Sequence, residues 1–307
     1  MGALADDSIS GVSVVIPAYN SASSILEAVG SALSQSGLDV EVIVVDDGSS
    51  DQTGALVSEL QDSRLRLLRQ ENGGPAAARN AGVGVASYSL VAFLDADDEW
   101  LADSLLERVQ PLYSDSYDMI CGGALARGVE DCSVASGGVT TDITLLDLAV
   151  QNRICTSSVV MRKDVFEAVG GFDTAFRGPE DYDLWLRIAA SHRIGKVAGH
   201  HVRYDDRPGS LSGLAERFLD EVFAVLKKAF EGGVLSDYQY LKPASVASQY
   251  VSASWMEWMC GDRAKALSRL KQSITTCPRP LKGVKRDYHR GKLALRYLFG
   301  KRPGGRS

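Results

Sequence analysis

Residues 89–100 read SLVAFLDADDEW, an apolar run followed at once by four acidic side chains, Asp95, Asp97, Asp98 and Glu99. Because the run is apolar on both faces, it is typical of a central strand in a sheet that helices cover on both sides. Carboxylates repel one another and are costly to desolvate, so their crowding predicts a cation or several backbone donors nearby. The stretch therefore indicates a buried sheet with a ligand site at its edge.

Upstream of this run, short β-rich segments alternate with helical segments. Strands are expected at VSVVIP (12–17), VEVIVV (40–45), RLRLLR (64–69) and SLVAFL (89–94), and helices at SSILEAVGSALSQ (23–35), TGALVSELQ (53–61) and AAARNAGVGVA (76–86). This βαβαβαβ order predicts an α/β fold, a Rossmann-like and mostly parallel sheet with helices on both faces. Ligands bind such a sheet beyond the carboxyl ends of its strands, where the polar clusters 17–20, 46–51 and 95–99 fall.

The second half of the chain is mixed and then becomes helical. Strands are expected at 117–126, 154–161 and 195–204, with helices at 143–150 and 180–190. Beyond these lie an amphipathic helix at 214–230 and a helical hairpin on either side of Gly261. The sequence thus predicts an α/β domain over residues 1–212 and a helical C-terminal region over 213–307.

The composition is that of a globular protein from a reducing compartment. Of the 307 residues, 45% are hydrophobic and 23% are charged, and the five cysteines form no CxxC pair, which argues against a disulfide framework or a zinc site. The start, MGALADDSIS, lacks the basic residues and apolar centre of a signal peptide. No run approaches the ~18 apolar residues of a membrane span, so a cytoplasmic protein is expected.

Charge divides the chain into an acidic body and a basic tail. Residues 279–307 carry ten Lys or Arg and one acid, a net charge of +9, while the other 278 residues hold 23 basic and 38 acidic groups, a net charge of −15. The acidic body argues against nucleic acid as a partner.

The basic tail has an amphipathic helical pattern. Apolar residues near one face are Leu281, Val284, Tyr288, Leu295, Leu298 and Phe299, with Lys282, Lys285, Arg286, Arg290, Lys292 and Arg296 around them. One interpretation is a segment that lies on an anionic membrane surface, which would place the protein peripherally on the inner face of the cell membrane. The other is a C-terminal helix docked on the acidic body.

The usual nucleotide motifs are missing: no GxGxxG follows the first strand, and no GxxxxGK[ST] occurs. Six other motifs stand in order, VSVVIPAYN (12–20), VVDDGSSDQT (44–53), ENGGPAAARNAG (71–82), FLDADD (93–98), GGFD (170–173) and EDYDLWLRIA (180–189). Together they resemble the family 2 glycosyltransferases, which have the GT-A fold, over roughly residues 11–212.

The resemblance implies an inverting transferase that moves a hexosyl or N-acetylhexosaminyl group from a nucleotide diphosphate sugar to a hydroxyl, and a UDP-sugar is the expected donor. The acceptor would be a glycan or lipid-linked molecule in cell-surface polysaccharide biosynthesis. The rival interpretation is a non-catalytic nucleotide-sugar or glycan-binding module that retains the fold, and a nucleotidyltransferase would need a glycine-rich, lysine-bearing loop that PAYN does not provide.

On the donor side, the resemblance gives Asp47 the role of accepting a hydrogen bond from the base. A buried carboxylate selects a base with a matching donor, because any other base leaves it unpaired. The base and ribose pocket is expected to be lined by Pro17, Ala18 and Tyr19. From the residues alone, Asp46 and Asp47 are alternatively caps of the helix that starts near Thr53.

Two further segments are expected to reach the donor. In ENGGPAAARNAG the glycines precede a helix start at Pro75, which leaves backbone N–H groups, including that of Gly74, free to face the donor. Arg79 either reaches the donor or forms a structural ion pair. The loop after the last strand has Arg207 where many relatives have a histidine, and an arginine can bind a diphosphate but cannot coordinate a cation.

A divalent cation, Mg²⁺ or Mn²⁺, is the expected partner of LDADD, because carboxylate oxygens suit these hard ions. In the family's pattern Asp95 contacts the ribose or the metal, Ala96 lines the donor site, and Asp97 and Asp98 lie at the ion. The alternative is that the acids cap a helix beginning near Leu101, the role expected for Glu99.

On the acceptor side, EDYDLWLRIA resembles the family's ED motif, in which Asp181 is the general base. The resemblance also places Glu180 and Phe172 near the acceptor, and Trp185, one turn after Asp181, is a candidate platform for a sugar. The alternative is that Glu180 and Asp181 are N-terminal helix charges and that both aromatic side chains belong to the core.

Overall fold

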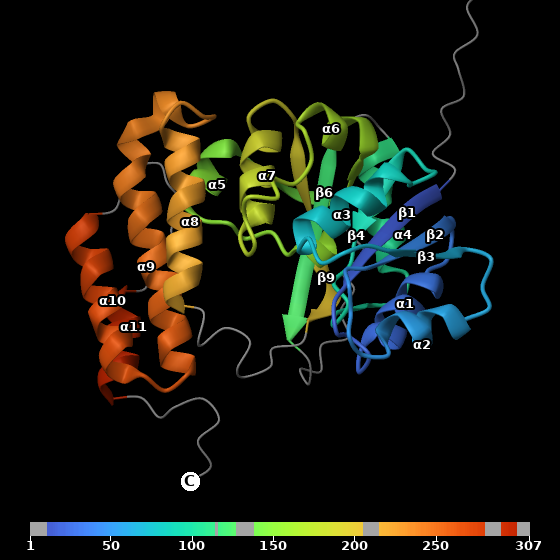
Figure 1. Ribbon diagram of the computed structural model, residues 1–307. Coiled ribbons are helices and arrows are strands. Elements are labelled where there is room, and N and C mark those ends of the chain that lie inside the picture. Colours follow the sequence, from blue (N-terminus) through green and yellow to red (C-terminus); the bar gives the residue numbers. More distant parts are fainter. Residues whose placement is uncertain (1–10, 114–115, 127–137, 205–214, 280–289, 300–307) are drawn as a thin grey trace, which may run out of the picture. The chain divides into compact units, whose positions relative to one another are not determined.

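The computed structural model describes residues 11–113, 116–126, 138–204, 215–279 and 290–299 (Figure 1). The described residues form two compact units. The first contains the described parts of Met1–Ile143, Ile154–Leu184 and Ser191–Asp205, and the second those of Thr144–Arg153, Trp185–Ala190 and Asp206–Ser307. No helix in these ranges has both the length and the apolar character needed to cross a membrane.

The first unit is built on a nine-stranded sheet with the order β3-β2-β1-β4-β8-β6-β9-β5, in which β7 also pairs with β9. The strands are β1 Gly11–Ala18, β2 Asp39–Asp46, β3 Leu65–Arg69, β4 Leu90–Phe93, β5 Glu99–Trp100, β6 Met119–Ala126, β7 Val139–Ile143, β8 Val160–Arg162 and β9 Ile194–Tyr204. The block β3-β2-β1-β4 is parallel, whereas β8 runs antiparallel to both β4 and β6. The carboxyl ends of β1, β2 and β4 therefore lie at one edge.

Helices cover both faces of this sheet (Figure 1). They are α1 Ile25–Leu33, α2 Thr53–Glu59, α3 Pro75–Gly84, α4 Ser104–Tyr113, α6 Lys163–Ala168 and the start of α7 Glu180–Ala189, with the 3-10 turn η1 Thr156–Ser158. Alternate residues of β1 pack against helices on opposite faces of the sheet, because successive side chains of a strand point to opposite faces. Val14 shares a core cluster with residues of α1, α2 and α4. Val15 faces α3, where a Cβ on Gly82 would lie 2.4 Å from its Cγ1.

The second unit is helical and has a core of its own. Its elements are α5 Leu145–Val150, α8 Ala215–Phe230, η2 Ser236–Leu241, α9 Lys242–Met259, α10 Arg263–Thr276 and α11 Arg290–Phe299. The ring of Tyr297 on α11 is fully buried, packs 5.0 Å from the ring of Trp258 on α9, and accepts a 2.9 Å hydrogen bond from Ser254. Helix α11 is thus docked on α9 through one side.

The predicted fold class, an α/β sheet followed by a helical region, is confirmed. The strand expected at 154–161 is wrong in extent: Thr156–Ser158 form the 3-10 turn η1, and only Val160–Arg162 is a strand. The elements β5, β7 and α6 were not predicted, and α4 starts at Ser104 where a helix beginning near Leu101 was only considered as an alternative. The division at 212/213 stays a prediction, and residues 144–153 and 185–190, expected before it, belong to the helical unit.

Candidate active site

The acidic residues after β4 form a tight turn. The backbone N–H of Asp98 donates to the carbonyl of Asp95 at 3.0 Å. Asp97 is exposed, Asp98 is 7% exposed, and the Asp95 side chain is about one third exposed. Glu99 does not cap a helix as expected, because it lies in β5 and pairs with Arg203 of β9 at 3.4 Å, while α4 starts only at Ser104.

Ser157 of η1 stabilises this turn through hydrogen bonds. The backbone N–H of Asp95 donates to the Ser157 hydroxyl at 3.0 Å, and that hydroxyl donates to Oδ2 of Asp98 at 2.5 Å. The Ser157 carbonyl accepts from Nε1 of Trp100 at 2.6 Å and from Nη1 of Arg108 at 3.4 Å. One serine thus contacts both ends of the acidic turn and is itself fixed by two buried donors.

Arg79 lies on α3 and joins the acidic turn to the start of α7. Its Nη2 donates to Oδ1 of Asp95 and its Nη1 to Oε1 of Glu180, both at 2.6 Å. The guanidinium also lies over the ring of Phe172, 5.3 Å from the centroid. The structure thus shows the ion-pair role considered for Arg79, and it places the carboxylate of Glu180, which was expected near the acceptor, in a buried contact with Arg79.

Burial and neighbouring charges shift the pKa values of Glu180 and Arg79. Burial raises the pKa of Glu180 to about 7, with a smaller contribution in the same direction from Asp181, although the Arg79 cation opposes the shift. Burial would also lower the pKa of Arg79, but the carboxylates of Asp95 and Glu180 outweigh it and leave that pKa raised. Arg79 is therefore charged at every working pH, whereas Glu180 ionises less readily than an exposed glutamate.

Asp181 stands at the first turn of α7 and is partly exposed. Its Oδ1 accepts from the backbone N–H of Tyr182 at 2.6 Å, and its Oδ2 accepts from the Thr156 hydroxyl at 3.2 Å. Burial raises the pKa of the nearby Cys155 thiol to about 12, and the negative charges of Asp98, Asp95 and Asp181 act in the same direction. Because the adjacent residues Thr156 and Ser157 donate to Asp181 and Asp98, the acidic turn and Asp181 lie in one neighbourhood.

Asp47, at the end of β2, holds the loop that leads into α3. It is 3% exposed and accepts from Nε2 of Gln70 at 2.7 Å and from the backbone N–H groups of Gly73 and Gly74 at 2.9 and 2.8 Å. The helix start at Pro75 is confirmed. The expectation that these N–H groups are free to face the donor is wrong, because the carboxylate already occupies them.

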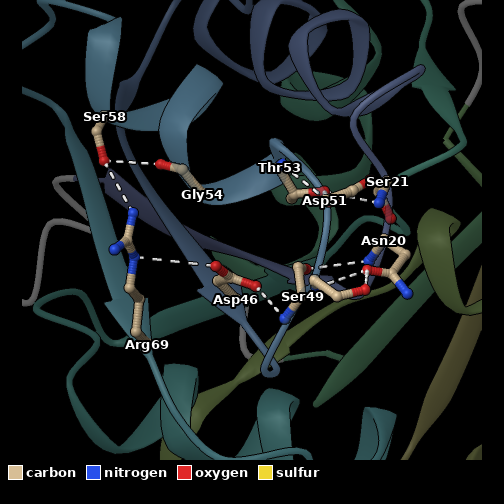
Figure 2. A network of polar contacts seen from close by, with 10 residues as sticks. Asn20, Ser21, Asp46, Ser49, Asp51, Thr53, Gly54, Ser58 and Arg69 are labelled. Carbon is tan, nitrogen blue, oxygen red and sulfur yellow. Dashed lines mark hydrogen bonds and ion pairs between the residues drawn. The ribbon is translucent and has the colours of Figure 1, made fainter.

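The loops after β1 and β2 are tied together by the polar network in Figure 2. The backbone N–H of Asn20 donates to the Ser49 hydroxyl at 3.0 Å, and the backbone N–H of Ser49 donates to Oδ1 of Asp46 at 3.0 Å. It is Asp51, through the N–H of Thr53 at 2.9 Å, that supports the start of α2, so the capping role weighed for Asp46 and Asp47 is not what either side chain does.

Beside this network the residues expected to form the base pocket differ in exposure. Tyr19 is 54% exposed, Pro17 is half-buried and Ala18 is 2% exposed. An exposed tyrosine ring on a loop that its neighbours fix offers an apolar face with little conformational entropy to lose. Tyr19 is therefore the residue of this group that is open to a ligand.

Two aromatic residues expected near the acceptor lie in the core. Trp185 is fully buried, and Phe172 is 2% exposed within a cluster of rings that includes Phe93 at 5.2 Å and Phe166 at 5.6 Å. Neither side chain has a free face on which a sugar could stack. The core interpretation of both residues is therefore the correct one.

The acidic turn offers few side chains to a divalent cation. Among the described residues, no group of three or more His, Cys, Asp and Glu side chains is arranged to hold a metal ion. Magnesium sites at phosphates need less, usually one or two carboxylates together with phosphate oxygens and waters. The exposed Asp97 fits that need, whereas one oxygen of the buried Asp98 is already bound by Ser157.

Arg207 lies outside the described residues, as do Leu281, Val284 and Tyr288 of the tail and the basic residues between them. Three residues at the site were missed from the sequence: Gln70, Thr156 and Ser157. Isolated neutral polar side chains carry no spacing signal, and only their partners in space, Asp47, Asp98 and Asp181, reveal them.

Solved structures share this architecture. A crystal structure of S. aureus TarS matches with a TM-score of 0.61 and 18% identity, over 92% of this chain and 52% of that one. S. aureus TarS 1-349 in complex with UDP matches with a TM-score of 0.55 and 17% identity, over 90% of this chain and 94% of that one. The likeness shows that this chain shares the fold of these structures.

The sequence model described as "Glycosyl transferase family 2" matches residues 13–167. The chain belongs to this family, as its six motifs suggested.

Two relatives illustrate the range of the family. The chain is 47% identical over 105 residues to "Succinoglycan biosynthesis protein ExoO" of Rhizobium meliloti, which covers 34% of this chain and 30% of that protein. It is 32% identical over 188 residues to the E. coli "UDP-Glc:alpha-D-GlcNAc-diphosphoundecaprenol beta-1,3-glucosyltransferase WfgD", over 61% of this chain and 72% of that protein. The chain thus spans less than a third of the first relative and about seven tenths of the second.

Proposed function

We propose that this chain transfers a hexosyl or N-acetylhexosaminyl group from a UDP-sugar to a hydroxyl of a glycan or lipid-linked acceptor in polysaccharide biosynthesis, with inversion at the anomeric carbon. The observation that carries the proposal is that consecutive residues of η1 contact both acid groups: Thr156 donates to Asp181 and Ser157 to Asp98. A donor-side acid turn and a partly exposed carboxylate in one neighbourhood are what a single displacement needs.

Asp181 is the general base of this proposal. It removes the proton from the acceptor hydroxyl while that oxygen attacks the anomeric carbon, and the bond from this carbon to the nucleoside diphosphate breaks. The two oxygens of this carboxylate are oriented by hydrogen bonds from the backbone N–H of Tyr182 and the hydroxyl of Thr156. Of the residues expected on the acceptor side, Asp181 is the one with an exposed surface.

The choice of UDP and of the acceptor class draws support from the relatives. WfgD is named for UDP-Glc and a diphosphoundecaprenol acceptor, and TarS 1-349 has been solved with UDP and with UDP-GlcNAc. In this chain Tyr19 would stack on the base, with Pro17 and Ala18 beside it, and Asp47 would fix the floor of the pocket through the loop of Gly73 and Gly74.

A divalent cation, Mg²⁺ or Mn²⁺, would be held by Asp97, with Asp98 and Asp95 supporting the turn. When bound, the cation stabilises the negative charge of the departing diphosphate. Arg207 is proposed to share this work by pairing with the phosphates.

A transfer assay with Asp181→Asn tests the proposal. The wild type is expected to transfer sugar from UDP-Glc or UDP-GlcNAc to a GlcNAc-diphosphate lipid in the presence of Mn²⁺, and the variant to lose at least about 10²-fold of that rate, since general-base catalysis contributes 10²–10⁴-fold. Glu167→Gln, an exposed acid on α6, is the matched control and should be unchanged.

Calorimetric measurement of UDP binding distinguishes the proposed transferase from the rival function, a non-catalytic binding module. A catalytic enzyme predicts UDP binding in both the wild type and Asp181→Asn, with transfer in the wild type alone. UDP binding in both proteins with transfer in neither would favour the binding module, and equal transfer rates would remove Asp181 as the base.

We also propose that α11 contacts an anionic membrane surface. Its docking through Tyr297 leaves Leu295 61% exposed and Leu298 47% exposed, beside the basic residues Lys292 and Arg296. Basic residues near such a surface contribute about 1 kcal/mol each. A location on the inner face of the cell membrane would bring the site to a lipid-linked acceptor.

Vesicle flotation tests this surface. The wild type should float with vesicles containing phosphatidylglycerol but not with neutral ones, and Leu295→Glu/Leu298→Glu should abolish flotation. Leu146→Glu on α5, at a position 41% exposed, is the control and should float. Equal flotation of the double variant and the wild type would contradict the assignment.

A further inference from the structure

The 3-10 turn η1 carries two adjacent hydroxyl side chains that serve two different acid groups. Thr156 donates through Oγ1 to Oδ2 of Asp181 at 3.2 Å. Ser157 donates through Oγ to Oδ2 of Asp98 at 2.5 Å and accepts from the backbone N–H of Asp95 at 3.0 Å. Neither residue belongs to any of the six motifs of the sequence.

The turn is rigid, which is what a positioning element requires. Thr156 is 8% exposed and Ser157 is fully buried. Within η1 the backbone N–H of Ser158 donates to the Cys155 carbonyl at 2.9 Å, and the Ser158 hydroxyl donates to the same carbonyl at 2.7 Å. Because buried polar groups in a satisfied network resist displacement, η1 holds its two hydroxyls at fixed places.

Two core side chains also form hydrogen bonds with the backbone of η1. Trp100 and Arg108 both donate to the Ser157 carbonyl, and the Arg108 guanidinium lies 4.5 Å from the Trp100 ring centroid. Arg108 is fully buried and has two further bonds to Ser104, from Nε to the carbonyl at 3.0 Å and from Nη2 to the hydroxyl at 3.2 Å. The backbone of Ser157 is thus anchored independently of its hydroxyl.

We infer that Thr156 and Ser157 are positioning residues that set the general base and the donor-side turn relative to each other. The inference rests on the proposed function, in which Asp181 takes the acceptor proton. Thr156 fixes the second oxygen of Asp181, whose first oxygen is fixed by the N–H of Tyr182, so the plane of the carboxylate is set before substrate binds. Ser157 fixes Asp98 and Asp95 and hence the shape of the turn that presents Asp97.

The two residues are expected to have different kinetic signatures. Loss of the Thr156 hydroxyl frees the base but leaves the donor contacts intact, so kcat falls while the KM for the donor stays. Loss of the Ser157 hydroxyl leaves the buried Asp98 carboxylate without this donor and loosens the turn, so the donor KM rises. A residue that only stabilises the fold would show neither pattern, since it would lower the amount of active protein and leave the constants of the folded fraction unchanged.

The test compares Thr156→Val, Thr156→Ser and Ser157→Ala in the full chain, with UDP-sugar transfer as the assay. Thr156→Val should lower kcat by about 10- to 100-fold, the usual effect of misplacing a catalytic group, with the donor KM within about twofold of the wild type. Thr156→Ser keeps the hydroxyl and should recover kcat to within about threefold. Ser157→Ala should raise the donor KM and the Kd for UDP with Mn²⁺, which calorimetry measures without turnover.

The outcomes separate this inference from the proposed function. Thr156→Val with a wild-type kcat, or Thr156→Ser as impaired as Thr156→Val, would overturn the role of Thr156, and unchanged UDP binding and KM in Ser157→Ala would overturn that of Ser157. A wild-type protein that binds UDP but transfers no sugar would overturn the proposed function itself. Because Thr156→Ser retains the hydroxyl and removes only one methyl group, it keeps the test valid even where Thr156→Val fails to fold.

Discussion

Arg79 and Glu180 lie 101 positions apart in the chain, and their side chains are joined by a buried hydrogen bond of 2.6 Å. The same guanidinium binds Asp95, so one cation ties α3 to both the acidic turn and the start of α7. Breaking a buried ion pair from one side leaves an uncompensated charge, which is far more costly than losing a surface pair.

Arg79→Met is therefore expected to lower the free energy of unfolding by about 3–5 kcal/mol, because it leaves the buried Glu180 without its cation. Urea denaturation followed by circular dichroism measures the change. The control is Glu167→Gln, which removes the exposed partner of Lys163 on α6 and should cost less than about 1 kcal/mol. A loss from Arg79→Met no larger than that of the control would show that the buried pair is not a stabilising unit.

Replacing Asp47 by asparagine should destabilise the loop before α3. The amide places an N–H₂ group against donors, so at least one of the N–H groups of Gly73 and Gly74 loses its acceptor, at a cost of about 1–3 kcal/mol. Hydrogen exchange should quicken at these two amides, and UDP affinity should fall. Asp39→Asn, at the exposed opposite end of β2, should change stability by less than about 0.5 kcal/mol and leave exchange at the loop unaltered.

Two glycines of α3 are expected to respond oppositely to alanine. At Gly82 the new methyl would lie 2.4 Å from Cγ1 of Val15, so Gly82→Ala should cost about 1–3 kcal/mol through overpacking of α3 against β1. At Gly84 nothing lies within 4 Å of the new methyl, and Gly84→Ala should be neutral or stabilise by up to about 1 kcal/mol. Thermal melting compares the two, and equal shifts would mean that α3 is not seated closely on β1.

His201 gives the fold a dependence on pH. Burial lowers its pKa to about 4, with the charge of Arg108 acting in the same direction, although its Nε2 lies 3.2 Å from Oε2 of Glu107. A depressed pKa means that the unfolded chain binds the proton first, so this stability is present above pH ~6.5 and is lost as the pH falls toward 4.

The measurement is the difference in unfolding free energy between wild type and His201→Gln at several pH values. The unfolding free energy of the wild type minus that of the variant should fall as the pH drops from 6.5 to 4, by at most about 1.4 kcal/mol per pH unit for this one group. A difference that stays constant across this range would contradict a neutral, buried His201.

Much of the fold could be predicted because its first half is local in sequence. The strands through 94 alternate with helices, and Pro75 after two glycines marks the start of α3. The second half was predicted less well. Strand β5 has two residues and β8 has three, which is too few for a periodic pattern, and both strands pair with strands that are distant in sequence.

The candidate site was predicted in part for the same reason. Acid groups at strand and helix ends stand out in the sequence, so Asp95, Asp97, Asp98 and Asp181 could be singled out as candidates. Phe172 and Trp185 were misplaced because an aromatic residue near a site looks the same whether it packs in the core or meets a ligand, and only burial decides. Thr156 escaped notice because a lone hydroxyl gains meaning only through the partner it contacts.

The position of β9 in the sheet has a consequence for how the chain matures on the ribosome. This strand is the last of the nine to be synthesised, yet it lies between β6 and β5 and also pairs with β7. Until residue 204 has left the exit tunnel, β6 has an open edge, which is a template for pairing with other chains. We therefore expect translation products that stop within α7 to aggregate, even though the parallel block that ends at residue 93 is already complete.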